Sequence, residues 1–242
     1  MRVFVLLVCL ALGPASVLGG SEPDFERLRQ ELIREIKQDV RETAESIGRD
    51  HFQEKVFQAL ASVPRHRFVP EKHRHQAYQN RPLPIGYGQT ISQPFIVALM
   101  TDLLDLEPEE TVLEVGTGSG YQAAVLAELV QEVVTVEIIP ELAEQAAERF
   151  QRLGLENIRA VQGDGYYGFP EKAPFDAIMV TAAGDHIPPP LIKQLKPGGR
   201  MVLPVGGPFM IQQLTLVSKE AGGEVRTRHL LPVRFVPLTG GH

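Results

Sequence analysis

The stretch TVLEVGTGSG, from Thr111 to Gly120, decides the fold expected for this chain. Its first half is a short apolar run with β-branched residues, which is typical of a buried strand, and three glycines at alternate positions follow. The next segment, YQAAVLAELV from Tyr121 to Val130, has the composition of a helix. Glycines let a ligand approach the backbone closely, and the free N–H groups of a helix N-terminus attract negatively polarised groups. The unit therefore predicts a strand, a ligand-binding loop and a helix.

The same alternation of strand and helix continues downstream. VVTVE, from Val133 to Glu137, predicts a second strand, and Pro140 opens a helix that runs to about Leu153. Three more strands are expected at residues 158–162, 175–180 and 200–205, and a short helix at 190–195. Continuous apolar strands that alternate with helices predict an α/β fold with a Rossmann-like, doubly wound, mostly parallel sheet.

The two ends of the chain add other elements. QQLTLVSKE and RTRHLLPVRFVPL predict two antiparallel C-terminal strands joined around Gly222. Helical spacing of apolar residues predicts an amphipathic helix over 24–47 and a second helix from Asp50, as N-cap, to Ser62. Residues 64–94 show little regular pattern, and loops of that length are more often functional than filler. We expect one domain over 21–242, with helices at 21–62, active-site loops at 63–94, and a cofactor-binding sheet with C-terminal strands at 111–242.

Composition excludes several classes of protein. The 242 residues include 24 Lys and Arg against 30 Asp and Glu, which gives a net charge of −6. This acidic balance argues against nucleic acid as a partner, because such binding needs broad positive charge. The only cysteine, Cys9, excludes a disulfide framework, a Cys-based zinc site and CxxC redox chemistry.

The first twenty residues have the layout of a secretory signal. Met1-Arg2 precede the apolar run VFVLLVCLAL, and small residues follow up to Gly20. The run is shorter than the roughly 20 residues that a membrane-spanning helix needs. We expect residues 1–20 to be a signal or an uncleaved anchor. If they are not cleaved, we expect them to be the only part of the chain that contacts a membrane. The alternative is a packed apolar N-terminus or a mis-assigned start.

The acid after the second strand points to a nucleoside cofactor. Glu137 lies 21 residues after Gly116, where a carboxylate can accept hydrogen bonds from both ribose hydroxyls. The glycine spacing is GxGxG and not the GxGxxG that suits a pyrophosphate, which favours S-adenosylmethionine over NAD. Asp164, in GDG after the third strand, is a candidate for contact with adenine, although such an Asp is as often a turn former. A tight turn with a solvated Glu137 is the alternative for the whole unit.

S-adenosylmethionine is a methyl donor, and two features that the sequence lacks indicate which kind of group accepts the methyl. Methyltransferases that act on planar nitrogens usually carry an Asn/Asp-Pro-Pro-Tyr/Phe motif after the fourth strand, where this chain has VTAAG at 180–184. No His or Lys base is evident beside the glycine loop. A carboxylate has an ordinary pKa of about 4 and is already ionised at neutral pH. It needs only positioning and desolvation, so a carboxylate acceptor is favoured.

Several motifs together resemble one family. They are VPRHRFVP (63–70), GYGQTISQP (86–94), LEVGTGSGYQAAVLA (113–127), GDGYYG (163–168) and VRFVPLTG (233–240). Over about residues 25–240 the chain resembles the protein-L-isoaspartate O-methyltransferase family, which are class I methyltransferases. The resemblance implies methyl transfer from S-adenosylmethionine to the free α-carboxylate of L-isoaspartyl residues in damaged proteins and peptides. The ester then collapses to a succinimide, and hydrolysis restores part of the normal aspartate.

The resemblance also implies site residues. Ser92 takes the place of the family's active-site serine, which orients the acceptor carboxylate and removes no proton. The residues expected to contact the cofactor are Thr90, Ile91, Gln93, Gly116, Gly118, Glu137, Asp164, Gly165 and Thr239. No metal is expected. Phe95-Ile96-Val97 stands where some members have a histidine, so the contact made by that histidine is in doubt. Arg65, His66 and Arg67 are candidates to hold an acidic substrate, with packing or solvated positions as the alternative.

Other functions remain open at this point. One is a class I methyltransferase that acts on another carboxylate or a small molecule, and another is a silent module that binds S-adenosylmethionine as a partner surface. Because this cofactor is made in the cytosol, we expect a cytoplasmic protein and a monomer. The signal-like start favours an exported or membrane-attached protein instead.

Overall fold

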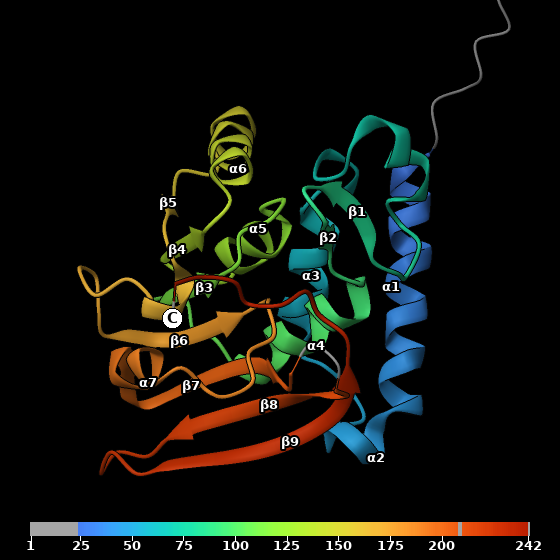
Figure 1. The fold of residues 1–242 in the computed structure, drawn as a ribbon. Helices are drawn as coiled ribbons and strands as arrows, with labels where there is room; N and C mark the ends of the chain where they lie inside the picture. The colour runs from blue at the N-terminus through green and yellow to red at the C-terminus, as the bar shows by residue number, and fades with distance from the viewer. Residues whose placement is uncertain (1–23, 208–209, 242) are drawn as a thin grey trace, which may run out of the picture.

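A computed structural model describes residues 24–207 and 210–241. Within these residues, the main sheet has seven strands in the order β5-β4-β3-β6-β7-β8-β9. Pairing is parallel from β5 to β7 and antiparallel at β7–β8 and β8–β9 (Figure 1). The strands are β3 (Thr111–Val115), β4 (Glu132–Glu137), β5 (Ile158–Gln162), β6 (Phe175–Val180), β7 (Leu195–Val205), β8 (Gln212–Lys219) and β9 (Val225–Val233). The predicted parallel sheet and its antiparallel C-terminal extension are confirmed.

Helices cover both faces of this sheet, because the side chains of each strand alternate between the faces. On one face, Val112 and Val133 pack in a core with helices α1, α3, α4, α5 and α6. On the other face, Leu113 and Val134 pack with Leu191 of α7. The helices are α1 (Phe25–Glu42), α2 (Ala44–Ile47), α3 (Glu54–Ser62), α4 (Pro94–Leu104), α5 (Tyr121–Ala127), α6 (Pro140–Leu153) and α7 (Pro189–Gln194). The fold is therefore doubly wound.

The sheet order determines where a ligand can bind. β3 lies between β4 and β6, so the chain leaves β3 towards one edge of the sheet and returns on the other side of it. In open α/β sheets, the crevice at such a point lies beyond the carboxyl ends of the strands. Here this is the end of β3 that continues into the glycine loop.

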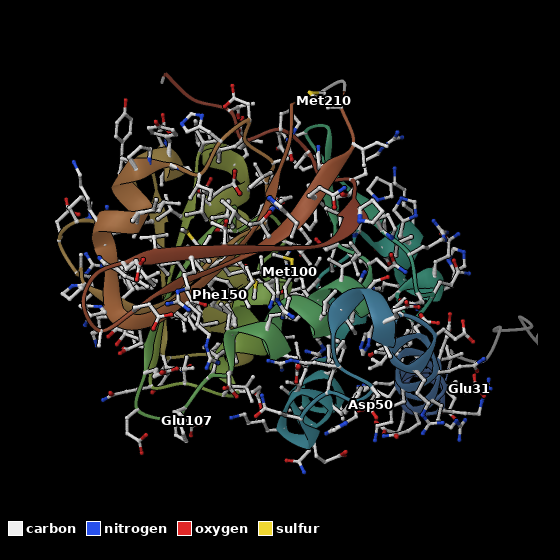
Figure 2. The ribbon with its side chains drawn as sticks, turned by 90° about the horizontal axis from the view of Figure 1, so that it is seen from below. Glu31, Asp50, Met100, Glu107, Phe150 and Met210 are labelled. Carbon is white, nitrogen blue, oxygen red and sulfur yellow. The ribbon has the colours of Figure 1, made fainter. Side chains whose placement is uncertain are left out.

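The N-terminal part differs from the prediction in two details. The single helix expected over 24–47 is interrupted at Thr43, which separates α1 from α2. The expectation that Asp50 caps the next helix is wrong, because α3 begins at Glu54 with Gln53 as its N-cap. Asp50 is exposed and contacts the imidazole of its neighbour His51, 2.6 Å away; Figure 2 shows it at the surface.

The segment between α3 and β3 is more regular than predicted. It contains the 3-10 helices η1 (Arg65–Arg67) and η2 (Glu71–Gln76) and a two-stranded hairpin of β1 (Leu83–Gly86) and β2 (Gln89–Ile91). Helix α4 follows directly and was not predicted at all. Figure 1 shows the hairpin beside α3 and α4, away from the strands of the main sheet.

No helix in residues 24–207 and 210–241 is both long and apolar enough to span a membrane. The signal-like segment expected at residues 1–20 lies outside the residues that the structure describes.

Candidate active site

The glycine loop leaves the carboxyl end of β3 in a backbone conformation that other residues rarely adopt. Gly116, Gly118 and Gly120 have φ values of 97°, 52° and 84°. A Cβ at Gly116 would collide with the hydroxyl of Thr181, and one at Gly120 would collide with the ring of Phe150. The Thr181 hydroxyl donates a hydrogen bond to the Gly116 carbonyl (2.7 Å). The loop therefore packs closely against Thr181 and Phe150, and the lack of side chains at its glycines lets a ligand approach its main chain.

Glu137 lies at the end of β4, beside this loop. Its side chain is buried, and its two carboxylate oxygens accept hydrogen bonds from the main-chain N–H groups of Gly118 (2.8 Å) and Ile139 (3.0 Å). Each carboxylate oxygen has a second acceptor position, so the group can also accept hydrogen bonds from two hydroxyls of a ligand.

The loop and Glu137 border a first cavity at the carboxyl edge of the sheet. Six of the residues predicted to contact a cofactor line it, namely Thr90, Gly116, Gly118, Glu137, Gly165 and Thr239. The C-terminal segment closes one side of this cavity, because Leu238 donates a main-chain hydrogen bond to Ala183 (2.8 Å) and Ala183 donates one to Val236 (2.8 Å). Thr181 and Ala182 also line this cavity. No motif in the sequence singles them out, although they follow β6 at the carboxyl edge of the sheet.

Three predicted cofactor contacts do not line this cavity: Gln93 lines a second cavity instead, and Asp164 and Ile91 line neither. The Asp164 carboxylate accepts hydrogen bonds from the main chain of Tyr166 (3.0 Å) and of Gly241 (3.1 Å), and it is not among the residues that line the cavity. Asp164 thus ties the C-terminal segment to the turn that carries Gly165. Ile91 is buried in the core, pairs with Leu83 across the hairpin, and lines neither cavity.

The second cavity contains Ser92. Its volume is about 1040 Å³, and Ser92 and Gln93 line it together with residues of the C-terminal segment, including Arg234 and Phe235. Two exposed apolar residues, Met210 and Ile211, also line it, and Figure 2 shows Met210 at the edge of the molecule.

The two cavities meet. Thr90, Thr181 and Val236 line both of them, so the Ser92 side and the glycine-loop side share one boundary. Group transfer between two bound molecules requires neighbouring sites of this kind.

Comparison with known proteins agrees with this arrangement. The family model for protein-L-isoaspartate(D-aspartate) O-methyltransferase (PCMT) matches residues 29–242. A protein-L-isoaspartate O-methyltransferase 2 of Syntrophobacter fumaroxidans is 58% identical over 239 residues, which are 99% of this chain and 97% of the relative. A protein-L-isoaspartate O-methyltransferase 1 of Cupriavidus necator is 52% identical over 242 residues, 100% of this chain and 93% of the relative. The chain belongs to the protein-L-isoaspartate(D-aspartate) O-methyltransferase family.

Solved structures give the same fold. A protein-L-isoaspartate O-methyltransferase superposes with a TM-score of 0.75 at 31% identity, covering 88% of this chain and 66% of the other. The fold of a Plasmodium falciparum putative protein-L-isoaspartate O-methyltransferase, solved in complex with S-adenosyl-L-homocysteine, matches with a TM-score of 0.72 at 24% identity, covering 90% and 99% of the two chains. The resemblance of the sequence motifs to this family is thereby confirmed.

The glycine loop of this family member fits a nucleoside cofactor by its own geometry. A Cβ at Gly116 would collide with Thr181 and one at Gly165 would collide with Val115, so both of these positions at the cavity require glycine. Glu137 supplies a carboxylate at the rim. Among the described residues, no group of three or more His, Cys, Asp or Glu side chains is placed to hold a metal ion.

One buried acid lies beneath this site. Glu114 of β3 is completely buried, and Thr135 of β4 donates a hydrogen bond to one of its carboxylate oxygens. Burial raises the pKa of Glu114 to about 8. Glu114 is therefore protonated at neutral pH and belongs to the sheet core, in contrast to Glu137 at the cavity rim.

Proposed function

We propose that the chain transfers a methyl group from S-adenosylmethionine to the free α-carboxylate of L-isoaspartyl residues in damaged proteins and peptides, which starts their repair through a succinimide. The observation that supports this function most directly is the shared boundary of the two cavities at Thr90, Thr181 and Val236. Membership of the protein-L-isoaspartate(D-aspartate) O-methyltransferase family supports the choice of acceptor.

The residues around the first cavity would hold the cofactor. Gly116 and Gly118 would contact its methionine part, Glu137 would accept hydrogen bonds from its ribose hydroxyls, and Gly165 would face the adenine. Thr239 and the segment before it would exclude water from the same cavity. Bound S-adenosylmethionine supplies an electrophilic methyl group attached to a positively charged sulfur.

The residues around the second cavity would hold the acceptor. The Ser92 hydroxyl would donate a hydrogen bond to the acceptor carboxylate and orient it. Thr90, which lines both cavities, and Gln93, which lines the second, would border the acceptor. The described lining of both cavities contains no His or Lys; its charged side chains are Glu137 and Arg234. A carboxylate needs no base, because it is ionised at neutral pH, so this lining suits a carboxylate acceptor.

The test uses the purified full chain, methyl-labelled S-adenosylmethionine and two peptides that differ only in an Asp or an isoAsp residue. We expect base-labile label on the isoAsp peptide alone, and a loss of at least about 100-fold in turnover for Ser92→Ala with cofactor binding retained. Label on neither peptide, despite cofactor binding, would overturn this function and leave another acceptor or a silent binding module.

A cytoplasmic monomer is the form that suits this reaction, since S-adenosylmethionine is made in the cytosol. Fractionation of cells with an antibody against the chain, followed by N-terminal sequencing, tests the location. Recovery in an exported fraction with residues 1–20 removed would contradict it.

A further inference from the structure

Arg65 of η1 is a buried positive charge without a counter-ion. Its side chain is 0% exposed. Among the described residues, no carboxylate lies within ion-pair distance of it. Removing a guanidinium from water is costly, and an apolar side chain of similar size would fill the same space without that cost. A buried, uncompensated charge therefore calls for a functional explanation.

The guanidinium connects the segments that border the two cavities. Its Nη2 donates a hydrogen bond to the main-chain carbonyl of Ser92 (2.7 Å), and its Nε donates one to the carbonyl of Ala77 (2.9 Å). Its Cζ lies 4.8 Å from the ring centroid of Tyr121, the first residue of α5 after the glycine loop. One planar group thus touches both the Ser92 segment and the start of the cofactor-side helix.

We propose that Arg65 is a positioning residue that holds Ser92 in register with the glycine loop and, through its charge behind the Ser92 main chain, favours an anionic acceptor. This inference rests on the proposed function. The direct substrate contact considered for Arg65 from the sequence does not fit its burial, so its effect must pass through Ser92 and through the field of its charge.

The distribution of charge supports the second part of the proposal, that Arg65 favours an anionic acceptor. The chain carries a net charge of −6, so an anionic acceptor is repelled overall and needs local positive charge. In the described lining of the Ser92 cavity, Arg234 is the only charged residue. Burial lowers the pKa of Arg65 to about 10, so the guanidinium remains charged at neutral pH. In a poorly solvated position its field is screened less than that of a surface arginine.

Two substitutions separate geometry from charge. Arg65→Lys keeps the charge but loses the fork that reaches two carbonyls, and we expect kcat to fall by about 10- to 100-fold, the range for a small misplacement of a reacting group. Arg65→Gln removes the charge as well, and we expect KM for the isoAsp peptide to rise by about tenfold beyond its value in Arg65→Lys. The matched control is Arg74→Lys, an exposed arginine in the neighbouring short helix η2, with unchanged kinetics.

A double-mutant cycle distinguishes positioning from general structural support. If Arg65 acts through Ser92, Arg65→Lys will cost less than about threefold in kcat in a Ser92→Ala background, because the group to be positioned is already gone. Affinity for S-adenosylhomocysteine, which reports an intact fold, should change by less than about twofold in each variant. The inference would be overturned if the losses in kcat of the two single variants simply multiplied in the double variant. Full turnover in the Arg65→Lys enzyme would overturn it as well.

A final measurement does not depend on activity. Amide hydrogen exchange in the segment 88–96 should be at least about fivefold faster in Arg65→Lys than in the native chain and unchanged in Arg74→Lys. Unchanged exchange would refute the positioning itself. Faster exchange in a chain that methylates no peptide would instead show that Arg65 holds the Ser92 segment while the proposed acceptor is wrong.

Discussion

The glycine loop and the Ser92 segment border the same pair of cavities but are held in different ways. The glycine loop is an extension of the sheet: Gly116 donates a main-chain hydrogen bond to Val136 (2.8 Å), and Thr181 donates one to Val115 (2.9 Å). The Ser92 segment depends on side chains from elsewhere, through the Arg65 guanidinium and through Asn80. The glycine loop, which forms the cofactor side, is therefore as rigid as the core. The Ser92 segment, which forms the acceptor side, can be disturbed by a single side-chain change that leaves the cofactor side intact.

The largest expected effect breaks the cofactor side. Gly116→Ala forces an alanine to φ 97° and drives its Cβ into the Thr181 hydroxyl. We expect a loss of stability of about 1–3 kcal/mol and a loss of about 100-fold in affinity for S-adenosylhomocysteine, which corresponds to about 2.8 kcal/mol. Chemical denaturation and calorimetric titration measure the two quantities. Gly222→Ala is the control, since a Cβ there meets open space; equal behaviour of the two variants would contradict the strained-loop argument.

A smaller effect on the same side comes from Glu137→Gln. The amide keeps one acceptor oxygen but loses the charge, and a hydrogen bond to a charged group contributes about 1.5–3 kcal/mol. We expect affinity for S-adenosylhomocysteine to fall by about 10- to 30-fold, with KM for the isoAsp peptide unchanged within about twofold. Titration and steady-state kinetics test this, with the exposed Glu141→Gln at the start of α6 as the control. A rise in peptide KM of the same size as the loss of cofactor affinity would show that the two sides are not separate.

Asn80→Ala sharpens the comparison from the acceptor side. The Asn80 side chain accepts a hydrogen bond from the main chain of Phe95 (3.0 Å) and donates one to Asp39 of α1 (2.6 Å). Without it, Phe95 loses a partner just beyond Ser92, and we expect kcat to fall by about tenfold with cofactor affinity retained. The exposed neighbour Gln79→Ala should leave both unchanged. A drop in cofactor affinity as large as the drop in kcat would show that Asn80 supports the whole fold.

The same contrast explains what the sequence could predict. The strands, the glycine loop and Glu137 were predictable, because apolar runs and spacing along the chain express the sheet directly. The contacts of Arg65 and Asn80 join side chains to main-chain groups 12 to 27 residues away, and no local pattern records such pairs. Helix α4 escaped prediction for a related reason: ten of its eleven residues are buried, so it lacks the polar stripe that marks an amphipathic helix. The role proposed for Ser92 rests on the family resemblance, because no local pattern singles this serine out.

The smallest effect on activity is expected inside the sheet, at Glu114. The folded chain keeps this carboxyl protonated up to a pKa of about 8, whereas the unfolded chain releases the proton near pH 4.5. Between these values the folded state binds more protons, so this group makes the free energy of unfolding fall as pH rises. The Glu114→Gln side chain cannot ionise and keeps an acceptor for Thr135. The free energy of unfolding of this variant, relative to that of the native chain, should therefore increase by about 1–3 kcal/mol from pH 5 to pH 8. One proton allows at most about 1.4 kcal/mol per pH unit.

Urea denaturation of both proteins across that pH range measures the difference, with the exposed Glu128→Gln as control. Methylation at neutral pH should stay within about twofold of the native rate, because Glu114 lines neither cavity. Parallel stability curves for the native chain and Glu114→Gln would mean that the acid is ionised in the fold. The sheet next to the glycine loop would then hold a buried negative charge close to Glu137. The two negative charges would repel each other and lower the stability of the fold, and substitution of either acid should remove that repulsion.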